Sequence, residues 1–154
     1  MVISNIEKLL KGREFITIAT ADNEGLPNAA PKFLLKYETP YLYIVDYAIA
    51  KTADNLRKNP RASLSVMDLH NLEGYRLNGT TELIEQGAEH ERLAAELRKS
   101  LVRLSASRVI EGLQTGKRHE HFELEMPDRF VVIKFRIREA VKIGTSGDLY
   151  KETV

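Results

Sequence analysis

The alternation of apolar and polar residues predicts a chain built mainly from β-strands, with a few helices. Strand-like runs lie at residues 15–21, 27–37, 41–45, 62–67, 75–83 and 130–138. Leucines recur every three or four residues from Leu93 to Leu104, which predicts a long amphipathic helix. A short helix is predicted before Gly12, and another begins near Lys51 and ends at Asn59-Pro60.

The order of these elements favours a mostly antiparallel sheet or barrel with helices packed on it. Turn-rich segments at residues 21–25 and 68–73 predict hairpins, and no regular crossovers separate the strands, so a doubly wound parallel sheet is disfavoured. The long helix is expected to break near residues 105–107. One or two strands are expected at the end of the chain, the second at residues 140–143, and the tail from Gly144 is expected to fray.

Composition narrows the class of protein. A chain of 154 residues that is 43% apolar and 29% charged fits one soluble globular domain, with a helical or loop insertion at about residues 87–128. The formal charge of +1 indicates neither nucleic acid nor a membrane surface as a partner, and no apolar run is long enough to span a bilayer. No signal peptide is visible, and the absence of cysteine is compatible with the cytoplasm. Redox chemistry would therefore require a bound cofactor or metal.

Most chemistry-bearing motifs are missing or weak. The sequence has no G-x-G-x-x-G, no P-loop and no G-x-S-x-G. His119 and His121 have a spacing that would place them on one face of a strand and suggests a metal site, but a solvated loop is the favoured interpretation. A basic run from Arg98 to Arg118 has no aromatic platform and is typical of an exposed helix face rather than a nucleic-acid site.

Lys51-Thr52 is the strongest local candidate for ligand binding. A lysine and a hydroxyl at the start of a helix suit a phosphate, because the first amides of a helix lack internal partners and carry partial positive charge. The alternative is an ordinary helix start with Thr52 as the cap. These residues alone leave the two interpretations about even.

The strand at residues 27–37 carries a second feature of interest. Pro31 cannot donate to a sheet ladder and is predicted to lie at an edge or a bulge. Ala29 and Ala30 beside it are small, which would let a flat ligand approach the backbone. The alternative, favoured by the local sequence, is a sheet edge protected by proline and lysine.

With these segments in order, the chain resembles the pyridoxamine 5'-phosphate oxidase-like proteins, the FMN-binding split β-barrel family. The resemblance covers about residues 6–85 and is carried by FITIATADNEGLPNAAPKFL, PYLYIVDYAIAKTADNLRKNPRASLSVMD and GYRLNGTTEL. Its most specific part is the pattern of Lys51-Thr52, Asn55-Leu56, Asn59-Pro60 and Ala62. It implies a mainly β (α+β) fold, an antiparallel split β-barrel of six to seven strands with flanking helices, that binds FMN at a homodimer interface.

The resemblance also implies which residues face the cofactor. The residues matched to the flavin ring, the ribityl chain and the phosphate are Ala30, Pro31, Lys32, Phe33, Ile44, Val45, Asp46, Ala50, Lys51 and Thr52. The oxidase carries arginines where this chain has Ala30 and Ala50, which leaves the phosphate less neutralised. No catalytic residue and no metal ligand is singled out.

The expected function is that of an FMN-dependent oxidoreductase acting on a small molecule that the sequence does not identify. The C-terminal sequence FRIREAVKIGTSGDLYKETV has no histidine or tryptophan, and this argues against oxidation of vitamin B6. Two alternatives remain: a non-catalytic flavin-binding or electron-carrier protein, and a haem-handling relative in which His119 or His121 is the iron ligand.

Overall fold

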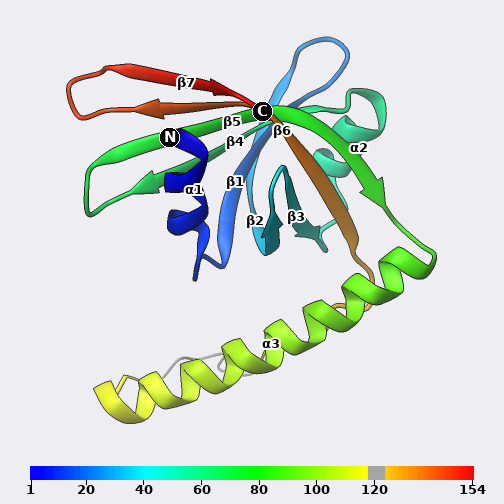
Figure 1. Ribbon diagram of the computed structural model, residues 1–154. Helices are drawn as coiled ribbons and strands as arrows, with labels where there is room; N and C mark the ends of the chain where they lie inside the picture. The colour runs from blue at the N-terminus through cyan, green and yellow to red at the C-terminus, as the bar shows by residue number, and fades with distance from the viewer. Residues whose placement is uncertain (118–123) are drawn as a thin grey trace. The chain divides into compact units, whose positions relative to one another are not determined.

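The computed structural model describes residues 1–117 and 124–154, and its elements follow the chain in the predicted order (Figure 1). The helices are α1 (Val2–Leu10), α2 (Lys51–Lys58) and α3 (Ala88–Thr115), and the strands are β1 (Phe15–Ala21), β2 (Pro27–Glu38), β3 (Tyr41–Asp46), β4 (Arg61–Asp68), β5 (Glu73–Ile84), β6 (Val131–Ile143) and β7 (Leu149–Thr153). The chain divides into two compact units, one of residues 1–84 and 130–154 and one of residues 85–129. That all 154 residues form a single domain stays a prediction.

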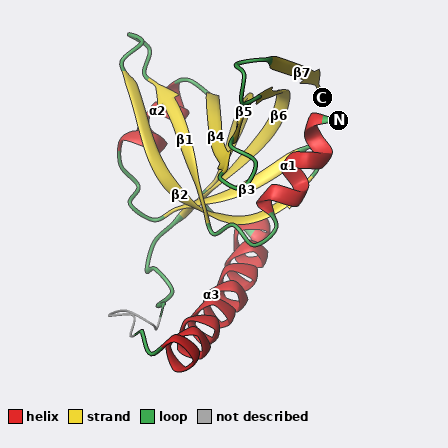
Figure 2. Cartoon of the chain, turned by 90° about the vertical axis from the view of Figure 1, so that its left-hand side faces the viewer, coloured by secondary structure: helices red, strands yellow, loops and turns green. Residues whose placement is uncertain are grey.

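The first unit is a closed antiparallel barrel. Its strands are hydrogen-bonded in the order β3-β2-β1-β4-β5-β6, and pairing of β3 with β6 closes the ring. Strand β7 extends the sheet by pairing with β6 outside the ring. Figure 2 shows the strands curving around a common centre. The predicted fold class, an antiparallel barrel of six to seven strands with flanking helices, is confirmed.

Strand β6 is longer than the sequence predicts. It runs unbroken through residues 131–143, where a strand ending at Arg138 and a separate one at residues 140–143 were expected. The register with the neighbouring strand β5 shifts between Asn78 and Gly79, which pair with Glu139 and Ile137. Arg138 is therefore an extra residue of β6, a bulge that lets both halves of β6 pair with β5. Gly79 suits this position because a Cβ atom there would lie 2.1 Å from the carbonyl oxygen of Arg136.

The C-terminal tail is also ordered, and the prediction that it frays is wrong. Strand β7 pairs with the second half of β6, and the Val154 amide donates to the Arg138 carbonyl at 3.0 Å. The Glu152 carboxylate accepts from the Ile3 amide at 3.1 Å, which ties the two ends of the chain together. Backbone pairing holds this strand, although most of its side chains are exposed and give no apolar pattern.

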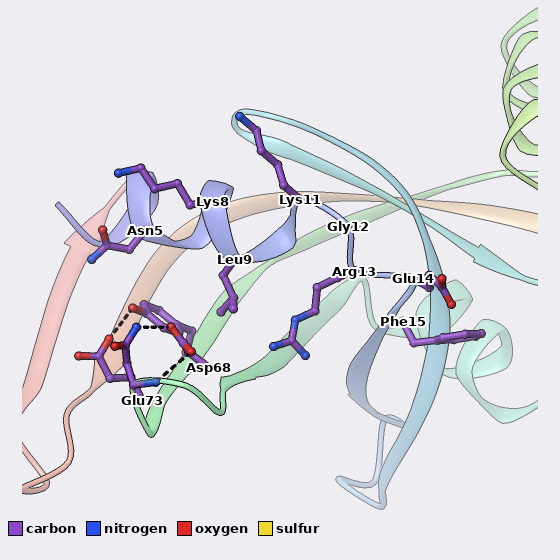
Figure 3. A pocket seen from close by; sticks show the side chains of 12 residues that line it. Asn5, Lys8, Leu9, Lys11, Gly12, Arg13, Glu14, Phe15, Asp68 and Glu73 are labelled. Atoms are coloured by element: carbon purple, nitrogen blue, oxygen red, sulfur yellow. Dashed lines mark hydrogen bonds between the residues drawn. The ribbon is translucent and has the colours of Figure 1, made fainter. Parts of the chain in front are cut away.

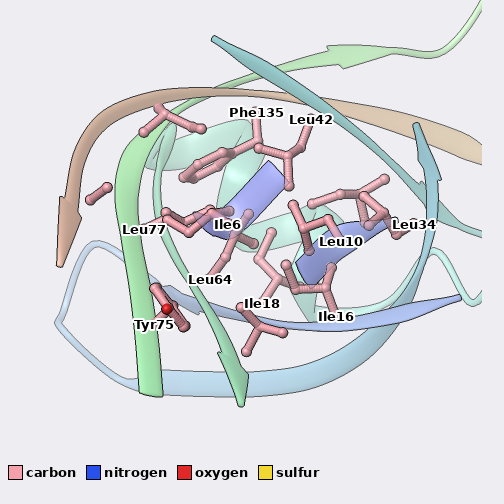
Figure 4. Packing of buried hydrophobic residues seen from close by; sticks show 14 of the residues in the cluster. Ile6, Leu10, Ile16, Ile18, Leu34, Leu42, Leu64, Tyr75, Leu77 and Phe135 are labelled. Carbon is pink, nitrogen blue, oxygen red and sulfur yellow. The ribbon is translucent and has the colours of Figure 1, made fainter. Parts of the chain in front are cut away.

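The core of the barrel is filled by apolar side chains from every strand of the ring and from two helices. Ile6 and Leu10 of α1 enter it from one side, and Leu56 of α2 joins it as well. Figure 4 shows these α1 side chains meeting those of the strands. The largest fully buried members of the cluster are Ile6, Ile18, Leu42, Ile44, Leu64, Leu77, Ile133, Phe135 and Ile137.

The second unit contains α3, which is one uninterrupted helix. The predicted break near residues 105–107 is wrong, because α3 continues through these residues. The Ser105 hydroxyl donates to the Leu101 carbonyl at 2.8 Å, and the Ser107 hydroxyl donates to the Arg103 carbonyl at 3.0 Å. A serine that bonds back along its own helix in this way is compatible with helical backbone. Gly116, in the left-handed conformation, ends the helix. His119 and His121 lie outside the described residues.

Candidate functional site at the start of α2

Helix α2 is fixed on the barrel by the amide side chains of the motif that carries the family resemblance. Asn55 Nδ2 donates to Thr20 Oγ1 on β1 at 3.1 Å, with both side chains buried. Asn59 Nδ2 donates to the carbonyl oxygen of Ala21 at 3.3 Å. Leu56, between them, packs into the core. Asn55, Leu56 and Asn59 therefore position the start of α2, and their side chains contact the barrel.

Thr52 is also engaged with the barrel. Its side chain is 3% exposed and its hydroxyl accepts from Asn28 Nδ2 on β2 at 3.2 Å. The helix begins at Lys51 with Ala50 as N-cap and no side-chain capping bond, so the alternative that Thr52 caps the helix is wrong. Among described residues, no side chain caps the first turn of α2, and its amides remain available to an anion.

Lys32 and Asp46 form a buried ion pair beside this turn. Lys32 Nζ lies 2.7 Å from Asp46 Oδ1, and the side chains are 10% and 0% exposed. Asp46 Oδ1 also accepts from the Ile49 amide at 3.2 Å, on the segment that leads into α2. Asp46 Oδ2 is buried and has no hydrogen-bond partner within the described parts of the chain. A buried acceptor without a partner is costly, and it offers a ligand a place to donate.

Lys51 makes a looser pair with Asp22, in the turn after β1. Lys51 Nζ lies 3.3 Å from Asp22 Oδ2, and the side chains are 47% and 19% exposed. Asp22 Oδ1 accepts from the amides of Glu24 at 3.0 Å and Leu26 at 2.9 Å. The bond from Leu26, followed by those from Lys51 and Glu24, lowers the pKa of the Asp22 carboxyl despite partial desolvation, so the group is ionised at neutral pH.

The first half of β2 is an open sheet edge next to these side chains. The ladder between β2 and β3 begins at Phe33, opposite Val45, whereas the ladder with β1 extends back to Pro27. Residues 27–32 therefore pair on one side only among the strands that the structure describes. Pro31 lies in this stretch, which confirms the predicted edge position. Ala29 and Pro31 are exposed, so a flat ligand has access to the backbone here.

Three apolar residues of the predicted site lie inside the packed structure. Phe33, Ile44 and Val45 are buried, and their backbones pair on both sides with neighbouring strands. Phe33 packs edge-on against Phe15, with ring centroids 5.9 Å apart. Ala30 and Ala50 contribute no polar side chain. The polar groups that the structure brings together are thus those of Lys32 with Asp46, and of Lys51 and Thr52 at the start of α2.

The structure adds residues that the sequence analysis did not single out. Asp22 contacts Lys51, Asn28 contacts Thr52, and Thr20 contacts Asn55. The sequence indicates the part that Asp22 plays in the turn, because an aspartate three residues before Gly25 is typical of a turn held by the aspartate side chain. The contacts of Asn28 and Thr20 depend on how α2 folds back over the barrel, and local sequence carries no sign of that.

A depression of about 820 Å³ lies elsewhere on the barrel. It is bounded by α1, the segment after it and the turn between β4 and β5 (Figure 3). Arg13, on its wall, donates to the carbonyl oxygen of Met67. Glu73 Oε1 lies 2.6 Å from Lys142 Nζ, and Glu73 Oε2 accepts from Tyr75 at 2.9 Å. These charged groups already have partners, and no residue implied by the resemblance lies here.

Within the described residues, no group of three or more histidine, aspartate or glutamate side chains is arranged to hold a metal ion. In the same parts of the chain, no helix has both the length and the apolar character needed to cross a membrane.

The structure is an antiparallel six-stranded barrel with one extra strand and flanking helices. The sequence profile of the pyridoxamine 5'-phosphate oxidase family matches residues 3–143. The chain therefore belongs to that family. A relative in Methanocaldococcus jannaschii, itself uncharacterised, is 30% identical over 105 residues, which cover 65% of this chain and 69% of the relative.

Solved structures of the same fold bind different cofactors. A protein related to general stress protein 26 from Clostridium acetobutylicum aligns with TM-score 0.69 and 15% identity, over 99% of this chain and 94% of the other. An FMN-binding protein from Nostoc punctiforme gives 0.58 and 15%, with the same coverage. A haem-binding protein from Mycobacterium smegmatis gives 0.65 and 18%, over 99% of this chain and 58% of the other. At these identities the likeness establishes the fold alone.

Proposed function

We propose that this protein is an FMN-binding flavoprotein that acts as an oxidoreductase on a small molecule, with the start of α2 as the phosphate end of its site. The observation that carries the proposal is the exposed Lys51 ammonium at an uncapped helix start, next to the open edge of β2. The hydrogen bond between Asn28 and Thr52 joins that edge to the first turn of α2, so one ligand can reach both.

The phosphate would be held by the first amides of α2 and by Lys51. Helix amides and the positive end of the helix dipole favour an anion, and an ammonium adds a charge-assisted hydrogen bond. Thr52 already accepts from Asn28 and keeps a hydroxyl hydrogen to donate. The arginines of the oxidase are absent at Ala30 and Ala50. Lys51 is therefore expected to supply most of the phosphate affinity.

The ring and the ribityl chain would lie along residues 27–32 of β2. Small and exposed residues there let a flat ligand reach unpaired backbone groups. Asp46 Oδ2 supplies a buried acceptor for a donor on the ligand, and Lys32, 2.7 Å from Asp46 Oδ1, holds that side chain in place. Ile44, Val45 and Phe33 fix the strand ends that carry these groups.

The bound flavin would supply the hydride or electron transfer, and the protein the binding and electrostatics. We assign no general acid or base. A non-catalytic carrier uses the same binding residues, so turnover with a nicotinamide donor and an acceptor separates the two functions.

A homodimer is part of the proposal. The outer face of β1 and β4 carries small side chains, among them Thr17, Ala19, Ser63 and Ser65, and such a surface allows a second barrel to approach closely. It adjoins a groove of about 560 Å³ whose lining includes Ala19 and Ser63. Analytical ultracentrifugation with and without FMN tests the assembly.

The absorption spectrum of the purified protein, before and after addition of FMN, tests the proposal directly. A flavin spectrum that stays with the protein through gel filtration is the expected result. A protein that is colourless as purified and retains no added FMN would overturn the assignment. A haem spectrum, or a spectral change on titration with haem alone, would favour the haem-handling alternative in its place.

A further inference from the structure

The Asp22 carboxylate has two oxygens with separate functions. Oδ1 accepts from the Glu24 and Leu26 amides and so holds the turn between β1 and β2. Oδ2 accepts from Lys51 Nζ at 3.3 Å and takes no part in the turn bonds. The turn therefore presents a fixed negative charge to the lysine at the start of α2.

We propose that Asp22 is a specificity-determining residue that competes with the phosphate of a bound ligand for Lys51. The inference rests on the proposed function, because it concerns the same phosphate end. A phosphate monoester must take Lys51 from Asp22 or share it, and it meets the repulsion of the ionised carboxylate. A flavin without a phosphate can bind while Lys51 stays paired with Asp22. Asp22 thus lowers the preference of the site for phosphorylated over unphosphorylated ligands.

The geometry of the pair allows this exchange. Lys51 is 47% exposed, and an exposed ion pair is weak, so its partner can be replaced at little cost. The Lys32–Asp46 pair beside it is short and buried, with exposures of 10% and 0%, and cannot open without leaving a charge unpaired. Of these two lysines, Lys51 is the one that can change partners when a ligand arrives.

The substitution Asp22→Asn removes the negative charge of the side chain and can keep its hydrogen bonds to the turn. Asparagine keeps a carbonyl oxygen that can accept from the turn amides at the Oδ1 position, and its amide nitrogen cannot accept from Lys51. We expect the dissociation constant for FMN to fall about two- to tenfold at low ionic strength, and less at high salt, while that for riboflavin, which has no phosphate, is unchanged. Fluorescence titration measures both constants.

Asp54→Asn is the matched control. Asp54 lies in the first turn of α2 and pairs with Arg57 at 3.1 Å, whereas Lys51 pairs with Asp22, so this change removes the same charge from the same region. A smaller gain than that of Asp22→Asn is expected. In a Lys51→Ala background, Asp22→Asn should lose most of its effect, because the two residues act through one contact.

The outcomes separate the inference from the function on which it rests. A wild-type protein that binds no flavin refutes the proposed function. A wild type that binds FMN through Lys51, with an Asp22→Asn variant that binds it no better than Asp54→Asn does, overturns the competition. If Asp22→Asn unfolds, Asp22→Ser, whose hydroxyl can still accept from the turn, answers the same question. The thermal melting temperature of each variant shows whether it is folded.

Discussion

Two lysine–aspartate pairs lie at the start of α2, and they differ in almost every physical respect. The Lys32–Asp46 pair is 2.7 Å long, with side chains 10% and 0% exposed. The Lys51–Asp22 pair is 3.3 Å long, with side chains 47% and 19% exposed. Both bring together one ammonium and one carboxylate, so residue type alone does not distinguish them.

The difference in burial shows which of the two lysines can bind an anionic ligand. Removing one partner of a buried pair leaves an uncompensated charge in a poor solvent, whereas either member of an exposed pair is readily hydrated. Lys32 is therefore committed to holding Asp46, whose second oxygen is buried and has no hydrogen-bond partner among the described residues. Lys51, in the exposed pair, is the lysine whose carboxylate partner can be replaced by another anion.

The largest expected effect comes from breaking the buried pair. Lys32→Met should lower the free energy of unfolding by about 3–5 kcal/mol, because Asp46 is left buried without a counter-charge. Lys51→Met, the same change in the exposed pair, should cost about 0–1 kcal/mol. Urea denaturation of both variants measures the two values. Equal losses would mean that the distinction between the pairs is wrong.

A smaller loss is expected where α2 is fixed to the barrel. Asn55→Ala removes the buried bond to Thr20 and should cost about 1–3 kcal/mol in urea denaturation, because a buried hydroxyl loses its donor. Thr20→Val added to Asn55→Ala should recover part of that loss, since the unsatisfied hydroxyl is then gone. A double variant that loses the sum of the two single losses would show that the two side chains do not interact.

A third pair, Glu73 with Lys142, extends the comparison, because its contribution to stability depends on pH. The bond from Lys142, with that from Tyr75, lowers the pKa of Glu73 below its ordinary value of 4.5. The same bond raises the pKa of Lys142 above 10.5. Glu73 therefore contributes stability that is present above about pH 4.5 and is lost as the pH falls through its lowered pKa. Lys142 contributes stability that is present below its ordinary value and is lost as the pH rises through its raised pKa.

Glu73→Gln tests this assignment. The urea midpoint of the wild type should fall more steeply below about pH 4.5 than that of the variant, and the two curves should also converge at strongly alkaline pH. Asp68, whose pKa is lowered chiefly by the Asn71 side chain, is present in both proteins and supplies a common acid-side slope. Parallel midpoint curves across the acid range would show that the Glu73 pair contributes nothing to stability.

Most of the fold could be predicted from the sequence because the strands carry their own periodicity. Strand β1 was located at its observed bounds, and α2 at its observed start. The wrong predictions concern segments in which hydrogen bonds, rather than the apolar pattern of the side chains, decide the structure. Strand β7 is held by its ladder with β6, and the serines of α3 bond back along the helix that they were expected to break.

Less of the candidate site could be predicted, because its polar contacts join segments far apart in the chain. The sequence pointed to Lys51, but the carboxylate that it pairs with, Asp22, lies 29 residues away. It also grouped Ile44 with the ligand-facing residues, whereas the structure places that side chain in the core. A single buried oxygen on Asp46 without a partner becomes visible only in three dimensions.

The most direct test of the account is the ratio of the dissociation constants for FMN and riboflavin, measured by calorimetry on the wild type and on Lys51→Ala. Lys51 carries the exposed charge at the proposed phosphate end, so the wild type should bind FMN at least about tenfold more tightly than riboflavin. The Lys51→Ala variant should lose most of that preference while its riboflavin affinity stays the same. Equal affinities for the two flavins in the wild type, or a preference that survives Lys51→Ala, would contradict the assignment of the start of α2 as the phosphate site.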